Sequence, residues 1–125
     1  MINAAASPAV RKRLARKEGV TRPHSLAEFF GVMTGRGIQV GQARVIFSAE
    51  DTVAWLIDAA ADLGFVELDA AEVLTALAGA KAFQVVGKRV HDYLHSVAAV
   101  KAKADRVLTR DADFTQICAL PVERP

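Results

Sequence analysis

Four acidic side chains lie at positions where they could share one reaction site: Glu28, Asp92, Asp111 and Asp113. Asp111 and Asp113 come directly after the β-prone run 106–109 ("RVLT"), and open parallel sheets place their sites at the carboxyl ends of strands. Carboxylates that are drawn together repel one another, so they need a compensating cation, and hard oxygen ligands select Mg²⁺ or Mn²⁺. Such a metal can generate hydroxide from bound water and stabilise charge on a phosphate oxygen.

The other two acids are expected to reach the same edge of the sheet from helices. Glu28 lies in the first turn of the helix that follows a short strand at Val20-Thr21. Asp92 lies in the second turn of the long helix that leads into the strand at 106–109. Because that edge collects the carboxyl ends of parallel strands, we expect the acidic groups to converge there.

Each of these acids also has a purely structural alternative, which the sequence leaves open. Glu28 has the spacing of a capping-box partner for Ser25. Asp92 is a favourable anion near a helix N-terminus. Asp111 stands where it can cap the short helix expected over 113–117 ("DFTQI").

Other reactive residue types point to no second site. His91 and His95 have the i, i+4 spacing of metal ligands, but no HExxH glutamate and no third ligand accompany them, so a surface or packing role is expected. His24 has no partner assignable from the sequence. Cys118 is the single cysteine, which excludes an intramolecular disulfide, and its apolar surroundings predict a buried, inert thiol. Neither a GxGxxG turn after a strand nor a Walker A or GxSxG motif occurs.

Helical apolar spacing alternates along the chain with short β-prone runs. This alternation predicts an α/β domain with a largely parallel sheet and right-handed crossovers. The expected elements begin with a helix that is capped by Ser7, starts near Pro8 and is stopped by Gly19. In order, there follow a strand at 20–21, a helix from Ser25 to Gly35, a loop over 35–44, a helix opened by Ser48 and stopped by Gly64, a strand at 65–68, a helix capped by Asp69, a long helix from Gly87, a strand at 106–109 and a last short strand at Val122.

Length and composition fit one soluble domain. The chain has 125 residues, of which 52% are hydrophobic and 24% charged, so it has ample material for a core. The net charge of +2 is mild, but basic residues crowd positions 11–22, where they form either a solvated face or an RNA contact. No sustained apolar segment resembles a signal peptide or a membrane span, so a cytoplasmic location is expected.

Two long segments resemble PIN domains, and among these the VapC-type toxins of toxin–antitoxin pairs. The segment "GVTRPHSLAEFFGVMTG" (19–35) is similar to a strand and helix that carry an acidic site residue in an "LAEF"-like setting. The segment "GKRVHDYLHSVAAVKAKADRVLTRDADF" (87–114) is similar to the second half of these domains. The resemblance implies a Mg²⁺- or Mn²⁺-dependent ribonuclease acting on single-stranded or looped RNA, with an antitoxin protein as partner and a tendency to form homodimers.

The resemblance also assigns roles to individual residues. Glu28 matches the family's second acid, Asp92 the third and Asp111 the fourth, and Asp113 matches an additional acid before the phenylalanine. Thr109 matches a strand-end threonine whose hydroxyl could bond a carboxylate or a metal-bound water. The implied mechanism is attack on a phosphodiester by metal-activated water.

One family feature has no counterpart here. Family members open with a central strand that ends in the first acidic residue, and nothing before Val20 fits that strand. The expected fold is therefore a PIN-like three-layer α/β/α domain over 1–125 that is incomplete at its N-terminus and lacks the central strand. An upstream start, a degraded gene and a chain that works without full metal coordination are the alternatives, and the last two allow a catalytically impaired remnant that only binds protein or RNA.

A chain without a central strand exposes the hydrogen-bonding groups of the neighbouring strands. We therefore expect the monomer to be poorly stable or prone to aggregate unless another strand fills the gap. Thermal unfolding followed by circular dichroism measures this, and a cooperative melt at high temperature would contradict it.

Overall fold

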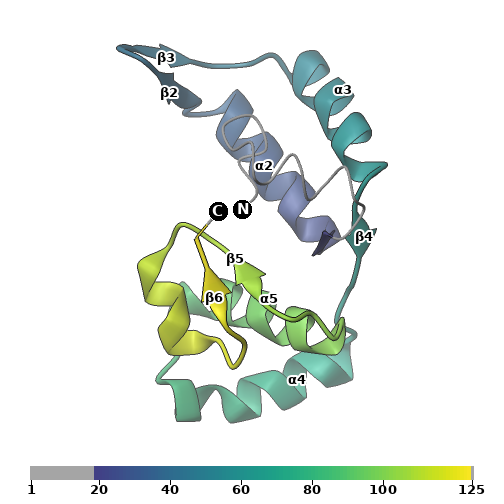
Figure 1. Cartoon of the computed structure of the whole chain (residues 1–125), viewed down its shortest axis with the longest axis vertical. Coiled ribbons are helices and arrows are strands. Elements are labelled where there is room, and N and C mark those ends of the chain that lie inside the picture. Colours follow the sequence, from purple (N-terminus) through teal and green to yellow (C-terminus); the bar gives the residue numbers. More distant parts are fainter. Residues whose placement is uncertain (1–18, 125) are drawn as a thin grey trace. The chain divides into compact units, whose positions relative to one another are not determined.

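The computed structural model describes residues 19–124, which form a mixed α/β protein. Two compact units divide the chain, the first ending at Gly64 and the second beginning at Phe65 (Figure 1). No helix formed by residues 19–124 is long and apolar enough to cross a membrane. In chain order the elements are β1 (Val20–Thr21), α2 (Pro23–Thr34), β2 (Ile38–Val40), β3 (Ala43–Val45), α3 (Ala49–Ala60), β4 (Gly64–Phe65), α4 (Ala70–Gly79), the 3₁₀-helix η1 (Ala80–Phe83), α5 (Arg89–Lys101), β5 (Val107–Leu108), the 3₁₀-helix η2 (Ala112–Ile117) and β6 (Val122–Glu123).

Helices α2 and α3 pack against each other in the first unit. Ser48 caps α3 as the sequence predicts, because its side-chain oxygen accepts a hydrogen bond from the Asp51 N–H at 3.1 Å. The rings of Phe29 and Trp55 stack between the helices, with centroids 4.8 Å apart and planes 18° from parallel. Thr52 is 3% exposed, and its hydroxyl donates to the Ser48 carbonyl, so its burial leaves no hydroxyl unsatisfied.

The beginning of α2 differs from the prediction. The helix begins at Pro23, with Arg22 as N-cap and no side-chain capping bond, because the fixed φ of proline suits the first helical turn. Ser25 therefore lies inside the helix instead of capping it. Glu28 lies in the second turn and not in the first, so it is not the capping-box partner of Ser25. Gly35 ends the helix as predicted.

A β-hairpin over 38–45 takes the place of most of the loop predicted over 35–44. Strands β2 and β3 are antiparallel, with Ile38 opposite Val45 and Val40 opposite Ala43. Gly41 has a φ of 61°, the positive value that the first position of a two-residue type II′ turn requires. Each strand has only three residues, which is too short for apolar alternation to stand out, so the loop prediction was wrong.

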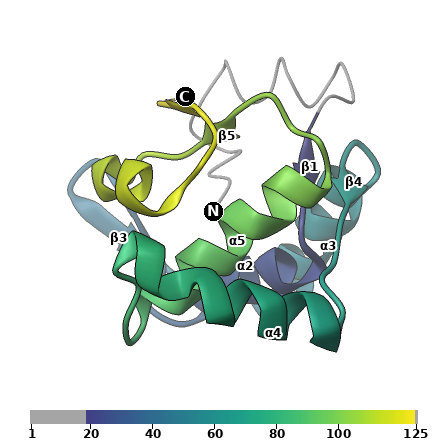
Figure 2. The ribbon, with the colours of Figure 1, turned by 90° about the horizontal axis from the view of Figure 1, so that it is seen from below.

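The core of the second unit forms around α5, which lies between α4 and the segment of η2 and β6 (Figure 2). The Tyr93 ring is 5% exposed, and its hydroxyl donates to the Ala76 carbonyl of α4 at 2.8 Å. The buried residues of this core are Ala76, Ala80, Tyr93, Phe114 and Ile117.

A capping box begins α4 and connects it to α5. The Asp69 carboxylate accepts from the Glu72 N–H at 2.8 Å and the Glu72 carboxylate accepts from the Asp69 N–H at 3.0 Å, which confirms the predicted cap. The Lys101 ammonium donates to the same Glu72 carboxylate at 2.7 Å. These bonds, first the one from the Asp69 backbone and then the one from Lys101, lower the pKa of Glu72 below its usual 4.5.

The strands form shorter ladders than the sequence suggested. β5 and β6 are parallel, with Val107 opposite Val122, which confirms both the parallel pairing and the strand at Val122. Arg106 reinforces this pair through an ion pair with Glu123 at 2.7 Å. Among residues 19–124 the ladders are three two-stranded sheets, β1–β4, β2–β3 and β5–β6, and not one sheet. β4 takes up only Phe65 of the strand expected over 65–68, because the chain turns instead toward the cap of α4.

Removing the buried Ser96 hydroxyl should loosen the contact between α5 and η2. Ser96 is 3% exposed, and its hydroxyl lies 2.7 Å from the Tyr93 carbonyl of its own helix and 2.9 Å from the Ile117 carbonyl of η2. We expect Ser96→Ala to lower the free energy of unfolding by about 1–3 kcal/mol, the cost of leaving a buried carbonyl unsatisfied. Urea unfolding measures this change. Thr115→Ala, which removes an exposed hydroxyl from η2, is the control, and an equal effect of both changes would contradict the assignment.

Candidate active site

The carboxyl end of β5 leads directly into the acidic segment that the sequence singled out. The Thr109 N–H donates to the Glu123 carbonyl at 3.1 Å, so the hydrogen bonds between β5 and β6 continue to the residue after β5. The Thr109 hydroxyl then accepts from the Asp111 N–H at 3.1 Å. One oxygen of the Asp111 carboxylate accepts from the Asp113 N–H at 2.9 Å and caps η2. Two consecutive hydrogen bonds therefore fix the backbone turn that carries the two aspartates after the strand.

The structural alternative for Asp111 is confirmed by this cap. Its carboxylate satisfies the first turn of η2, although the helix begins at Ala112 and not at Asp113 as expected. Both Asp111 and Asp113 remain exposed. A carboxylate has two oxygens with about four acceptor positions, so the bond to the Asp113 N–H leaves most of that capacity for other groups.

Asp92 lies in the first turn of α5, one turn earlier than predicted, and one face of this helix packs against η2. Two residues of that face fix the geometry. The Arg89 guanidinium donates to the Asp113 carbonyl at 3.1 Å, and the Ser96 hydroxyl lies 2.9 Å from the Ile117 carbonyl. Asp92 lies between them at i+3 from Arg89 and i−4 from Ser96, and such positions share one side of a helix. Helical spacing therefore puts Asp92, which is half-buried, on the side of α5 that carries Arg89 and Ser96.

Glu28 belongs to the first unit and pairs locally. Its carboxylate lies 3.3 Å from the His24 Nε2, one helical turn earlier on α2. The i, i+4 spacing of these two residues is the signal that could have identified this partner for His24. The structure does not relate the position of Glu28 to those of the three aspartates, which all lie in the second unit.

The predicted metal site stays a prediction. Carboxylate oxygens suit Mg²⁺ or Mn²⁺ in kind, but within residues 19–124 no three histidine, cysteine or acidic side chains form a group that could hold a metal ion. His91 is exposed and His95 half-buried. The opening helix expected before Gly19, with the basic residues at 11–17 for which RNA contact is one alternative, lies outside the described residues. Cys118 is half-buried against the core of the second unit, so its predicted burial holds in part.

One feature of the second unit was not predicted from the sequence. A hollow of about 250 Å³ lies beside the Arg89–Asp113 contact and is lined by Ala82, Phe83, Gln84, Arg89, Gln116 and Ile117. Its residues come from three separate elements, and neither the spacing of the two glutamines nor any motif brings them together in the sequence.

Comparison with known proteins adds no relative. No protein-family model, no curated protein and no solved structure matches the chain.

Separating the structural from the chemical role of Asp111 needs a pair of substitutions. Asp111→Ala removes the cap of η2 and should lower the free energy of unfolding by about 0.5–2 kcal/mol. Asp111→Asn keeps a capping oxygen. It should lower the free energy of unfolding by only a few tenths of the loss in Asp111→Ala, since Asn and Asp cap about equally well. Chemical denaturation of both variants measures the difference, and equal losses would show that the carboxylate charge itself holds η2.

Proposed function

We propose that this chain is a Mg²⁺- or Mn²⁺-dependent endoribonuclease of the PIN type, the toxin of a cytoplasmic toxin–antitoxin pair. Its substrate would be RNA, its partners a cognate antitoxin protein and a second copy of the chain, and its fold a PIN-like α/β/α arrangement. The mixed α/β architecture is compatible with that fold.

The observation that carries the proposal is the way β5 ends. A parallel strand delivers Thr109, Asp111 and Asp113 to its carboxyl end in a turn held by consecutive hydrogen bonds. Sites of open α/β sheets form at such ends, and Asp92 lies in the first turn of α5, the turn whose Arg89 donates to the Asp113 carbonyl. These positions are also the ones at which the sequence resembles the acidic residues of PIN domains.

Within this proposal the residues have separate tasks. Asp92, Asp111 and Asp113, which all belong to the second unit, would hold the metal, which would supply a hydroxide nucleophile and stabilise charge on a phosphate oxygen. The Thr109 hydroxyl, by accepting the Asp111 N–H, fixes the direction in which the chain leaves the strand.

A second candidate is a PIN-like binding module without turnover. The observation in its favour is the cap of η2, because Asp111 already has a structural task there. This candidate predicts that antitoxin or RNA binds without metal-dependent cleavage.

RNA cleavage with and without metal distinguishes these two functions. We expect cleavage of single-stranded RNA with Mg²⁺ or Mn²⁺, its loss with EDTA, and a fall of about 100-fold or more in Asp92→Asn, the size expected when one charged group of a reaction centre is removed. Asp105→Asn, an exposed acid of the same unit, is the matched control.

Circular dichroism must show that the Asp92→Asn variant keeps its fold. Unchanged cleavage in that folded variant would exclude the acidic cluster as the site. Binding of RNA without any cleavage in the unsubstituted chain would favour the binding module.

A further inference from the structure

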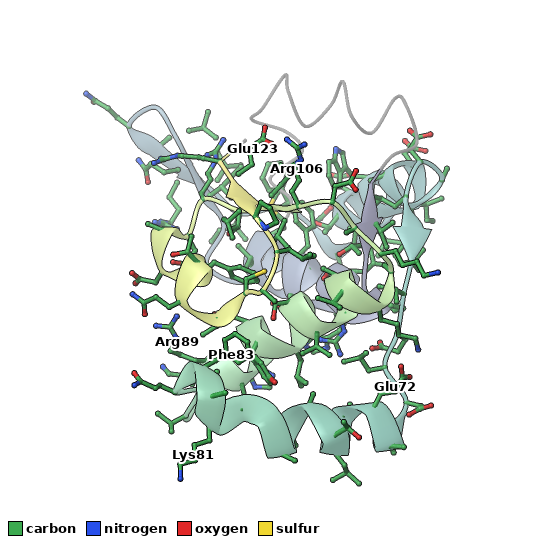
Figure 3. The ribbon with its side chains drawn as sticks, turned by 60° about the horizontal axis from the view of Figure 1, so that its bottom comes forward. Glu72, Lys81, Phe83, Arg89, Arg106 and Glu123 are labelled. Carbon is green, nitrogen blue, oxygen red and sulfur yellow. The ribbon has the colours of Figure 1, made fainter. Side chains whose placement is uncertain are left out.

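Side chains of three kinds border the hollow beside the Arg89–Asp113 contact. Phe83 and Gln84 come from the end of η1 and the turn after it, Arg89 from the start of α5, and Gln116 from η2. Figure 3 shows Phe83 and Arg89 next to each other in the second unit, while Lys81 points away from them. An aromatic ring, two amides and a guanidinium thus border one space of about 250 Å³.

Phe83 offers a fixed aromatic surface. Its ring packs on the buried Tyr93 ring, with centroids 5.6 Å apart and planes 43° from parallel. The Tyr93 ring is itself held by the hydrogen bond from its hydroxyl to the Ala76 carbonyl. Phe83 is half-buried, so part of it stays accessible from the hollow. Nucleic-acid bases stack on such rings whatever their sequence, with about 1–3 kcal/mol per base.

The polar groups of the hollow suit a base edge and a phosphate. Gln84 and Gln116 are both exposed, and each amide carries donors and an acceptor, the combination that pairs with the edges of bases. A guanidinium has five N–H donors in a planar fork. In Arg89, one of its terminal nitrogens donates to the Asp113 carbonyl. The remaining donors suit a phosphate, which arginine binds through two parallel hydrogen bonds.

Gln84 has an unusual backbone for a residue with a side chain. Its φ of 55° and ψ of 36° place it in the left-handed region, which favours glycine. The N–H of Gln84 donates to the Lys81 carbonyl and thereby closes the end of η1. Glycine would close this turn with less strain, and a left-handed residue of this kind is a recurrent feature of binding sites.

We propose that this hollow binds one unpaired nucleotide of the RNA substrate, with the base on Phe83 between the two amides and a phosphate on Arg89. The assignment rests on the proposed function, since Arg89 joins the hollow to the Asp113 segment. Typical pockets for drug-sized ligands measure about 300–1,000 Å³, so the smaller volume here fits a single nucleotide. A paired base has its edge occupied and its faces stacked, so duplex RNA cannot enter in the same way.

The test measures binding in the Asp92→Asn chain with EDTA present, so that cleavage plays no part. Fluorescence anisotropy follows short labelled single-stranded RNAs, namely homopolymers of A, C and U, and the same strands in duplex form. We expect Gln116→Ala and Arg89→Gln each to weaken binding of the preferred single strand by about 5- to 100-fold. Lys81→Gln, an exposed cation of η1 outside the hollow, should change it less than about 2-fold, as expected for a non-specific charge.

Each outcome decides something. If Gln116→Ala and Arg89→Gln behave like Lys81→Gln, or if duplex binds as tightly as single strand, the nucleotide site is wrong. No RNA binding in the parent chain also overturns it. If Arg89→Gln loosens the fold, Gln116→Ala still decides, because the Gln116 side chain is exposed. Loss of binding in these variants, in a parent chain that never cleaves RNA, would support the site and refute the nuclease. RNA cleavage by the unsubstituted chain, with binding unchanged in Gln116→Ala and Arg89→Gln, would support the nuclease and refute the nucleotide site.

Discussion

The contact between α5 and η2 is the constraint on which the candidate site depends. Ile117 is 1% exposed and Phe114 6% exposed, so η2 is held to α5 by apolar burial. The hydroxyl of Ser96 and the guanidinium of Arg89 add polar bonds at the two ends of the contact. Since η2 begins directly after Asp111, these interactions decide where the acids at the end of β5 lie relative to Asp92.

The same contact makes the structural and chemical roles of the acidic segment compatible. Asp111 caps η2 with one oxygen, and the cap directs the chain from the exposed strand end into the core at Phe114. A capping carboxylate is fixed in orientation without being buried. Such a group has lost part of its conformational freedom on folding, so less is lost when a ligand binds to its other oxygen. A cap and a ligand group are therefore not exclusive alternatives at this position.

Elements that begin with a side-chain cap could be predicted from the sequence. Ser48 and Asp69 form hydrogen bonds with residues three positions later, so the information for these helix starts is local. The start of α2 was misplaced because Pro23 can end a strand or begin a helix, and here its fixed φ serves the first helical turn. The hairpin at 38–45 was missed because its strands are too short for alternation to show.

Only those features of the candidate site that depend on neighbouring residues in the chain could be predicted from the sequence. The sequence places Asp111 and Asp113 after a strand, and the structure agrees. Arg89 meets Asp113, and η1, α5 and η2 border the hollow, only because separate elements pack together. Neither feature can be predicted from the spacing of residues along the chain. For Glu28 the sequence suggested a cap, whereas the turn of α2 set by Pro23 brings it to His24.

Paramagnetic broadening of amide NMR signals by Mn²⁺ tests most directly whether these carboxylates form a metal site. The ion broadens signals of nearby amides whether or not the chain cleaves RNA. The account predicts selective broadening at Asp92, Asp111 and Asp113 at low Mn²⁺ concentration, reversed by excess Mg²⁺. Broadening that is absent from all three, or that centres on another acidic region such as Asp58 and Asp62 of the first unit, would contradict it.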